Sequence, residues 1–198
     1  MRVQTVLAGA AIALAAATAP LVSNAAELVA NGGFETGSLS SWTGGGSFTG
    51  VQCPGPGPTV HGGNCSLFDG NIGSTDSLSQ IVATVAGQSY DYSFWLLSDG
   101  GTPNAFTFSL GGVTLVSLTN APASSGFTHF TGSVVAASSN ASLAFGFRDD
   151  PGFWFLDDVS LVNGAAIPEP ASWALMLAGF LGAGVAIRSS RRRAAVAA

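Results

Sequence analysis

The sequence predicts an all-β protein, an antiparallel β-sandwich flanked by an N-terminal signal peptide and a single C-terminal transmembrane helix. Between the two ends, short segments alternate apolar and polar residues and are separated by glycine turns, which is typical of antiparallel strands. No segment in this region has the apolar period of a helix. Glycine contributes 27 of the 198 residues and charged residues only 9%. This composition favours a loop-rich β protein.

The first 25 residues have the parts of a secretory signal peptide. Arg2 supplies a positive charge, residues 6–17 form an apolar run, and Ser23, Asn24 and Ala25 are the small residues that precede a cleavage site. Signal peptidase is therefore an expected partner. The domain that follows, residues 26–166, is expected to be exported.

Two cysteines, Cys53 and Cys65, flank a loop rich in proline and glycine. In the oxidising environment of an exported protein, two cysteines at this spacing are expected to form a disulfide. Closing the loop would stabilise the fold by about 3 kcal/mol on the chain-entropy model. The alternative, a metal site shared with His61, needs more ligands than the loop supplies.

Seven segments of the exported domain are predicted strands. They cover residues 78–85, 89–98, 105–110, 113–118, 127–136, 142–148 and 153–162. Gly111 and Gly112, between the third and fourth of these segments, are typical of a two-residue hairpin turn. Seven or more strands at this spacing predict two packed antiparallel sheets.

The last predicted strand carries an aspartate that is expected to face the core. Side chains alternate between the two faces of a strand. The more apolar face is expected to hold Phe153, Phe155, Asp157, Val159 and Leu161. A buried carboxylate needs a partner. The candidates for Asp157 are Arg148, main-chain N–H groups and a metal ion; alternatively, Asp157 caps a turn.

The C-terminal tail has three parts in a fixed order. The prolines of the first part, Pro168-Glu169-Pro170, end the preceding domain because proline continues neither a strand nor a helix. The uncharged run 171–187 would rise about 25 Å as a helix, which is the lower limit for crossing a membrane. A basic tail over 188–193 follows, and its arginines are expected to stay on the cytoplasmic side.

This tail resembles the PEP-CTERM sorting signal of Gram-negative bacteria. The matching residues are Pro168, Glu169, Pro170, Trp173, Ala174, Arg191, Arg192 and Arg193. The resemblance implies a sorting signal over 167–193 and processing at the PEP box by an exosortase-type membrane protease. It also implies a protein that is first membrane-anchored and then at the cell surface or extracellular. Such a tail is also named an ice-binding protein C-terminal domain, although it supplies no surface for binding ice.

The two ends of the exported domain resemble jelly-roll carbohydrate-binding modules, which have the galactose-binding-like fold. The segment Asn31-Gly32-Gly33-Phe34-Glu35, followed by Trp42, is similar to their opening, and residues 153–161 are similar to their closing strand. The resemblance implies an antiparallel jelly-roll β-sandwich whose first and last strands lie close together. Several members hold a structural calcium ion there, and Glu35 and Asp157 match the acidic ligands of that site.

Sugar binding requires aromatic faces beside a few polar groups. Trp95 is the first candidate platform because its neighbours Phe94 and Leu96 are expected in the core, and Trp154 is the second by the same alternation. The alternative is that both tryptophans pack beneath loops. Trp42 is expected in the core.

The charge of the exported domain excludes one class of partner. Ten carboxylates stand against a single arginine, Arg148, which is a balance of −9. Such a surface repels phosphate backbones, so nucleic acid is not an expected partner. An anionic polysaccharide could be held only through a cation.

The sequence gives little support for catalysis. The only histidines are His61 and His129, and no hydrolase motif is present. We therefore predict an exported, non-catalytic protein of the cell envelope or extracellular matrix, structural or adhesive in association with exopolysaccharide. The alternative is a lectin-like module that recognises a defined glycan.

Overall fold

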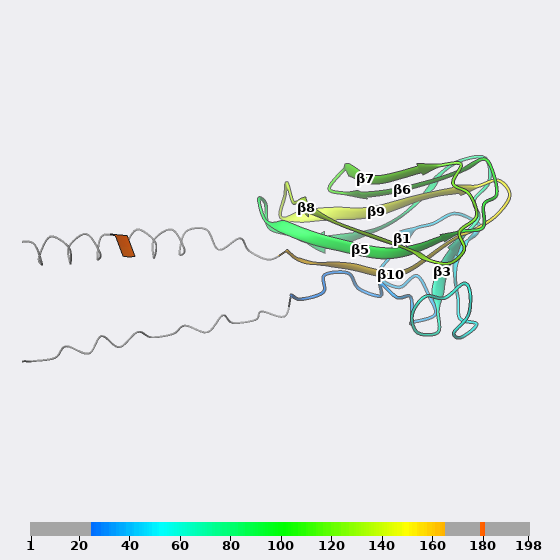
Figure 1. The fold of residues 1–198 in the computed structure, drawn as a ribbon, viewed down its shortest axis with the longest axis horizontal. Helices are drawn as coiled ribbons and strands as arrows, with labels where there is room; N and C mark the ends of the chain where they lie inside the picture. The colour runs from blue at the N-terminus through cyan, green and yellow to red at the C-terminus, as the bar shows by residue number, and fades with distance from the viewer. Residues whose placement is uncertain (1–24, 165–178, 181–198) are drawn as a thin grey trace, which may run out of the picture.

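The structure is a computed structural model that describes residues 25–164 and 179–180. Within these residues, ten strands form two sheets that pack face to face (Figure 1). The strands are β1 (Thr43–Gly44), β2 (Thr49–Gln52), β3 (Ser66–Asp69), β4 (Asp76–Ala83), β5 (Ser89–Ser98), β6 (Asn104–Leu110), β7 (Val113–Thr119), β8 (Thr128–Val135), β9 (Asn140–Asp149) and β10 (Trp154–Asn163).

Both targeting segments lie almost wholly outside the described residues. This applies to the predicted signal peptide except Ala25, to the sorting-signal residues and to the predicted membrane helix except residues 179–180. Among the described residues, no helix has the length and apolar character that crossing a membrane requires.

Residues 25–164 form an all-β sandwich, as predicted. One sheet has the order β1-β4-β9-β6-β7 and the other β2-β3-β10-β5-β8, and every pairing is antiparallel. The seven predicted strands correspond to β4–β10, whereas the short strands β1–β3 were not predicted. The turn between β6 and β7 consists of Gly111 and Gly112, with φ of 58° and 83°, as the two-residue hairpin requires.

The core is built largely from phenylalanine. Phe94 of β5 packs from one sheet onto Phe106, Phe108 and Phe145 of the other, with ring centroids 5.7, 5.1 and 5.4 Å away. All four rings are at most 1% exposed. These centroid distances are typical of attractive aromatic pairs, so the two inner faces are held together by interlocking rings.

The opening motif contributes to this core. Phe34 is fully buried and stacks on Trp42 at 5.7 Å. The indole Nε1 of Trp42 donates to the carbonyl of Asn31 at 3.1 Å. Trp42 is thus a core residue, as predicted, and these two rings fix the segment from which Glu35 projects.

Strand β10 departs from strict alternation. The register of β10 against β5 shifts between Asp157 and Ser160, and Asp158 has a φ of 47°. This bulge changes which face points inward: Trp154 and Leu156 are buried before it, and Val159 and Leu161 after it. The prediction that Phe153 and Phe155 face the core is therefore wrong; Phe153 is 40% exposed.

The two ends of the domain meet at one end of the sandwich, as the jelly-roll resemblance implied. The N–H of Leu28 donates to the carbonyl of Leu161 at 2.9 Å, and Glu27 bridges to Val162. At the opposite end, β5 and β9 finish and β6 and β10 begin (Figure 1). We call this second end the distal end.

Candidate functional site

Asp157 lies in the β10 bulge and is fully buried. Its carboxylate accepts hydrogen bonds from the main-chain N–H groups of His61 (2.8 Å), Gly62 (3.0 Å) and Asp158 (2.8 Å). Burial raises the pKa of Asp157 to about 6, and the three N–H groups oppose that rise. Of the partners predicted for the Asp157 carboxylate, the structure shows the main-chain N–H groups. Arg148 donates to Asp150 instead.

Asp157 is buried for a different reason from the one predicted. It shares its face with Phe155 on the outside of the sheet, and the loop of His61 and Gly62 covers it there.

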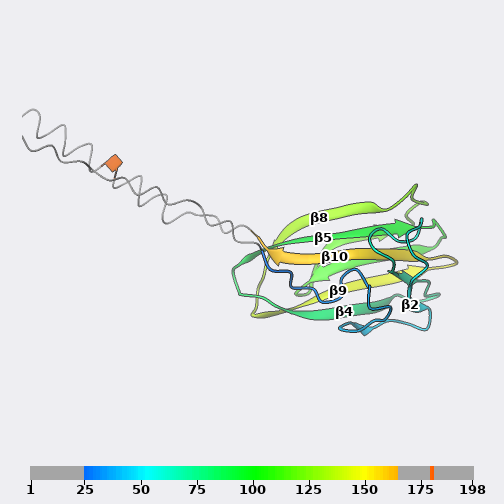
Figure 2. The same cartoon turned by 90° about the horizontal axis from the view of Figure 1, so that it is seen from below.

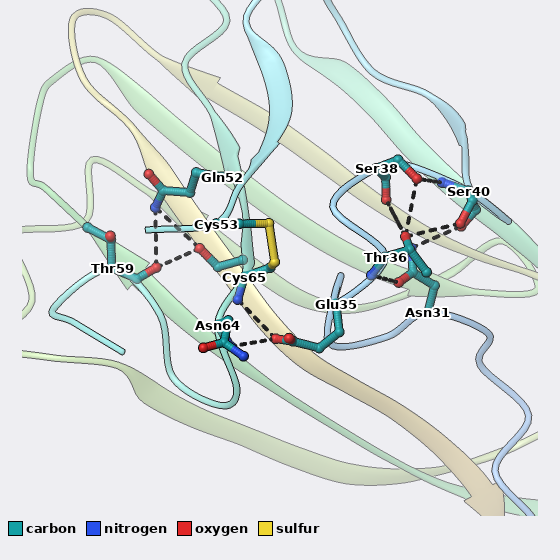
Figure 3. Close-up of a disulfide and its surroundings, with 11 residues drawn as sticks. Asn31, Glu35, Thr36, Ser38, Ser40, Gln52, Cys53, Thr59, Asn64 and Cys65 are labelled. Atoms are coloured by element: carbon teal, nitrogen blue, oxygen red, sulfur yellow. Dashed lines mark hydrogen bonds between the residues drawn. A yellow bond between two sulfur atoms is a disulfide. The ribbon is translucent and has the colours of Figure 1, made fainter. Parts of the chain in front are cut away.

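Glu35 holds the same loop from its other end. The carboxylate accepts the N–H groups of Asn64 and Cys65, each at 2.9 Å (Figure 3). These two hydrogen bonds keep the pKa of Glu35 below its usual range. Cys65 also forms the predicted disulfide with Cys53. The loop is thus fixed by one covalent bond and two carboxylates.

The predicted calcium ligands Glu35 and Asp157 both lie near Gly33, but the Glu35 atom closest to it is a methylene carbon. A Cβ on Gly33 would lie 3.4 Å from Oδ1 of Asp158, 3.8 Å from Cγ of Glu35 and 3.9 Å from Oδ1 of Asp157. Each carboxylate accepts main-chain N–H groups and keeps lone pairs, but the oxygens of Glu35 point toward Gly63 and the N–H groups of Asn64 and Cys65. In the described part of the chain, no three His, Cys, Asp or Glu side chains form a metal-binding group. Calcium at Glu35 and Asp157 stays a proposal.

Trp95 faces outward from β5, as predicted, but its ring faces are covered. His61 stacks on it with ring centroids 3.7 Å apart and planes 15° apart. His129, its direct partner on β8, stacks on it at 4.2 Å and 8°. Trp95 therefore offers a ligand its edge, not an open face. We call His61, Trp95 and His129 the aromatic stack.

Trp154 is not a ligand platform. It is 1% exposed, packs on Phe106 at 5.6 Å and donates its Nε1–H to the carbonyl of Arg148 at 2.9 Å. Its ring forms only part of the wall of a cavity of about 430 Å³ beneath the β7–β8 loop. The sequence placed it outward because the β10 bulge reverses the alternation.

A groove of about 500 Å³ lies on the outer face of β10, β5 and β8, which run side by side (Figure 2). It is lined by Asp91, Tyr92, Ser93, His129, Thr131, Gly132, Ser133, Ser160 and Val162. Cross-strand pairing puts Ser93 between Ser160 and Thr131. The aromatic stack lies beside this row of hydroxyl groups, because Trp95 and His129 form the next outward-facing pair along β5 and β8, and it borders the groove through His129. We call this feature the outer groove.

Two carboxylates border the outer groove. Asp91 accepts a hydrogen bond from Ser133 Oγ at 2.5 Å, and Glu27 accepts one from Ser160 Oγ at 2.5 Å. Sequence reasoning missed the groove residues of β8, although the alternation of residues 127–136 places His129, Thr131 and Ser133 on one face. The same alternation placed Ser160 on the outward face of the last strand, but it could not show that this strand and the strand of Thr131 lie on either side of Ser93.

Among the described residues, His61 has a carboxylate partner, but neither histidine is hydrogen-bonded to a nucleophile. His61 Nδ1 lies 2.7 Å from Asp158 Oδ2, which is the histidine–carboxylate half of a nucleophile-activating triad. No hydroxyl or thiol in the described part of the chain hydrogen-bonds to either histidine. The imidazoles instead pack against Trp95.

The comparisons with known proteins address the tail and the fold separately. Residues 166–193 match the model of the PEP-CTERM protein-sorting motif. This motif indicates export and surface sorting in Gram-negative bacteria. No curated protein matches the sequence.

Several solved structures share the fold. The module TmCBM61, solved with β-1,4-galactotriose, is 22% identical with a TM-score of 0.54 over 70% of this chain and 99% of its own. A xylan-binding domain from CBM 22 is 17% identical with a TM-score of 0.52 over 75% and 99%. The enzymatically active domain of the bacteriophage CBA120 tailspike protein 4 is 17% identical with a TM-score of 0.51 over 68% and 21%. The chain therefore carries a PEP-CTERM sorting motif behind a domain with the jelly-roll fold of carbohydrate-binding modules.

Proposed function

We propose that this protein is a non-catalytic component of the bacterial envelope or extracellular matrix, and that it contacts exopolysaccharide through the outer groove. In this proposal, signal peptidase removes the leader, the C-terminal helix anchors the chain, and an exosortase-type protease processes it at the PEP box. The sorting motif supports the export route. The outer groove is the observation that carries the binding role.

The chemistry of the outer groove suits an uncharged polysaccharide. The hydroxyls of Ser93 and Thr131 can each donate and accept hydrogen bonds, as sugar hydroxyls do. Ser160 Oγ donates its proton to Glu27 and can still accept a hydrogen bond. The carboxylates of Asp91 and Glu27 accept hydrogen bonds from sugar hydroxyls but repel acidic sugars. The groove is also open along three strands, which suits a chain better than a single small molecule.

A non-catalytic role is favoured by the positions of the two histidines. Both rings lie against Trp95, where they stiffen the wall of the groove. The alternative, a lectin-like module for one defined glycan, is favoured by the same rigid wall, because a fixed surface discriminates among sugar shapes.

The test compares polysaccharide binding by the full-length wild type with binding by a variant in which a larger side chain fills the outer groove. Thr131→Trp places a large side chain in the outer groove and is expected to weaken binding at least tenfold. Thr114→Trp is the matched control, since Thr114 is an exposed threonine on edge strand β7 of the other sheet. Equal binding by both variants, or no binding by the folded wild type, would contradict the proposal. A glycan array separates the alternatives: one bound glycan indicates a lectin, and broad binding of matrix polysaccharide indicates an adhesive role.

A further inference from the structure

The distal end of the sandwich holds two aspartates that face each other without a counterion. Asp149 ends β9 and is fully buried, and neither of its carboxylate oxygens has a hydrogen-bond partner among the described residues. Asp99 follows β5 and is exposed. A buried carboxylate without a partner is costly, so this arrangement calls for something that neutralises it.

The glycines of two neighbouring loops show where these oxygens converge. A Cβ on Gly152 would lie 2.3 Å from Oδ1 of Asp99 and 2.7 Å from Oδ1 of Asp149. A Cβ on Gly101 would lie 2.5 Å from the same Asp149 oxygen and 1.7 Å from the carbonyl oxygen of Pro151. No side chain other than hydrogen fits at either position. Two carboxylates and a carbonyl therefore surround one small space.

The charge of this space is not compensated by protein. Arg148 is the only arginine or lysine among the residues that the structure describes, and its Nε and Nη2 both donate to Asp150. Burial, followed by the charge of Asp99, raises the pKa of Asp149 to about 7. Neutralisation therefore requires either a bound proton or a bound cation.

We propose that Asp99, Asp149 and the carbonyl of Pro151 form a calcium site at the distal end. Calcium accepts carboxylate and carbonyl oxygens in irregular geometry and completes its shell with water. Asp99 leaves one side open to solvent for those waters. The ion would join the β5–β6 loop to the β9–β10 turn, which Asp99 already links by accepting the N–H groups of Gly101 (3.0 Å) and Phe153 (2.7 Å).

This site is separate from the one proposed at Glu35 and Asp157. The two share no hydrogen-bond partner among the described residues. It also does not depend on the outer groove or on polysaccharide binding. With few protein ligands, its Kd is expected in the range of extracellular modules, about 10⁻⁴–10⁻³ M.

The test is calcium binding by the full-length protein, measured by titration calorimetry and by thermal unfolding in calcium chloride or in chelator. A hundredfold excess of calcium over Kd is expected to raise the Tm by about 5–10 °C for each site. Asp149→Asn and Asp99→Asn should each lose one bound calcium and its share of the Tm rise. Glu35→Gln should leave this calcium bound. Asp91→Asn removes a carboxylate that lies outside this site and is the matched control for calcium. It should bind the same number of calcium ions as the wild type does.

A second signature separates a cation site from a general loss of stability. In chelator, Asp149→Asn should unfold at a higher temperature than the wild type, because one of two facing carboxylates becomes neutral. In calcium chloride, the wild type should unfold at a higher temperature than Asp149→Asn. If Asp149→Asn does not fold, the exposed Asp99→Asn decides the matter. Wild-type stoichiometry and Tm rise in Asp99→Asn would overturn the proposal, as would the absence of any bound calcium in Glu35→Gln.

Discussion

The imidazole of His61 stacks on the indole of Trp95, with ring centroids 3.7 Å apart and planes inclined by 15°. His61 belongs to the disulfide-closed loop and Trp95 to the centre of β5, so this contact fastens the loop to the sheet. The ring is also held by Asp158, whose Oδ2 lies 2.7 Å from Nδ1 of His61. A loop residue thus holds Trp95, on whose indole the groove residue His129 also stacks.

His61→Ala is expected to uncover one face of Trp95. Aromatic stacking contributes about 0.5–1.5 kcal/mol, so the free energy of unfolding should fall by about 1 kcal/mol. Acrylamide should quench tryptophan fluorescence more strongly in this variant. His61→Phe keeps the stack without the bond to Asp158 and is the matched control. Unchanged quenching in His61→Ala would show that the stack does not shield Trp95 in solution.

Replacing both cysteines with serine is expected to lower the free energy of unfolding by about 3 kcal/mol. Cys53 and Cys65 are 12 positions apart, and opening a loop of this size restores that much chain entropy to the unfolded state. Urea denaturation of the double variant and the wild type measures the difference. Thiol labelling of the denatured, unreduced wild type should find no free cysteine within the domain; two labelled thiols would contradict the bridge.

The strands were predictable because period-two alternation and glycine turns are local signals. Strand β5 shows this best: its predicted bounds are those observed, and Tyr92, Phe94 and Leu96 are buried as expected. The short strands β1–β3 escaped prediction because segments of two to four residues carry too little alternation to be recognised. Their positions depend on partners that are distant in sequence.

The candidate site was less predictable than the fold. Asp157 was correctly expected to be buried, but a β10 bulge moves Trp154 inward and Phe155 outward. A bulge depends on tertiary contacts, here the loop that covers Asp157. The stacking of His61 and His129 on Trp95 likewise joins segments that no local pattern connects.

Calcium is expected to stabilise the loop at Glu35 and Asp157 as well. Both residues hold the same loop through main-chain N–H groups, so an ion bound to their carboxylates would tie the two ends of that loop together. At a hundredfold excess over Kd the gain is about 2.7 kcal/mol. Glu35→Gln should lose this share of the calcium-dependent rise in Tm, measured against protein in chelator. A calcium response identical to that of the wild type would remove Glu35 from the ligand set.

The stability of the metal-free protein is expected to fall as the pH rises from about 4 to about 6, through the titration of Asp69. Burial raises the pKa of this carboxyl from 3.8 to about 6, and nearby Asp76 adds to the rise. Within this window the folded state binds more protons than the unfolded state, so the free energy of unfolding decreases with pH. Asp69→Asn should flatten the curve. Denaturation in chelator between pH 4 and 8 provides the comparison, and parallel curves would contradict this origin.

The last prediction is that the tail, residues 167–193, acts as a temporary anchor whose three parts fail in different ways. Replacing Arg191, Arg192 and Arg193 should weaken membrane retention, because an apolar run at the lower length limit depends on its flanking charges. Replacing Pro168-Glu169-Pro170 should leave the chain inserted but uncut, since the run and the arginines are unchanged.

Neither change should affect the folded domain, because β10 ends at Asn163 and the contacts that close the sandwich involve Leu28 and Leu161. Equal Tm values for the domain in all three proteins would confirm this independence. Processing itself is measured by intact mass spectrometry of envelope and medium fractions from a host that has the sorting protease. The wild type should end near the PEP box, and the proline-box variant at Ala198. A wild-type protein that also ends at Ala198 would contradict processing but not anchoring, because the anchor requires only the apolar run and its arginines.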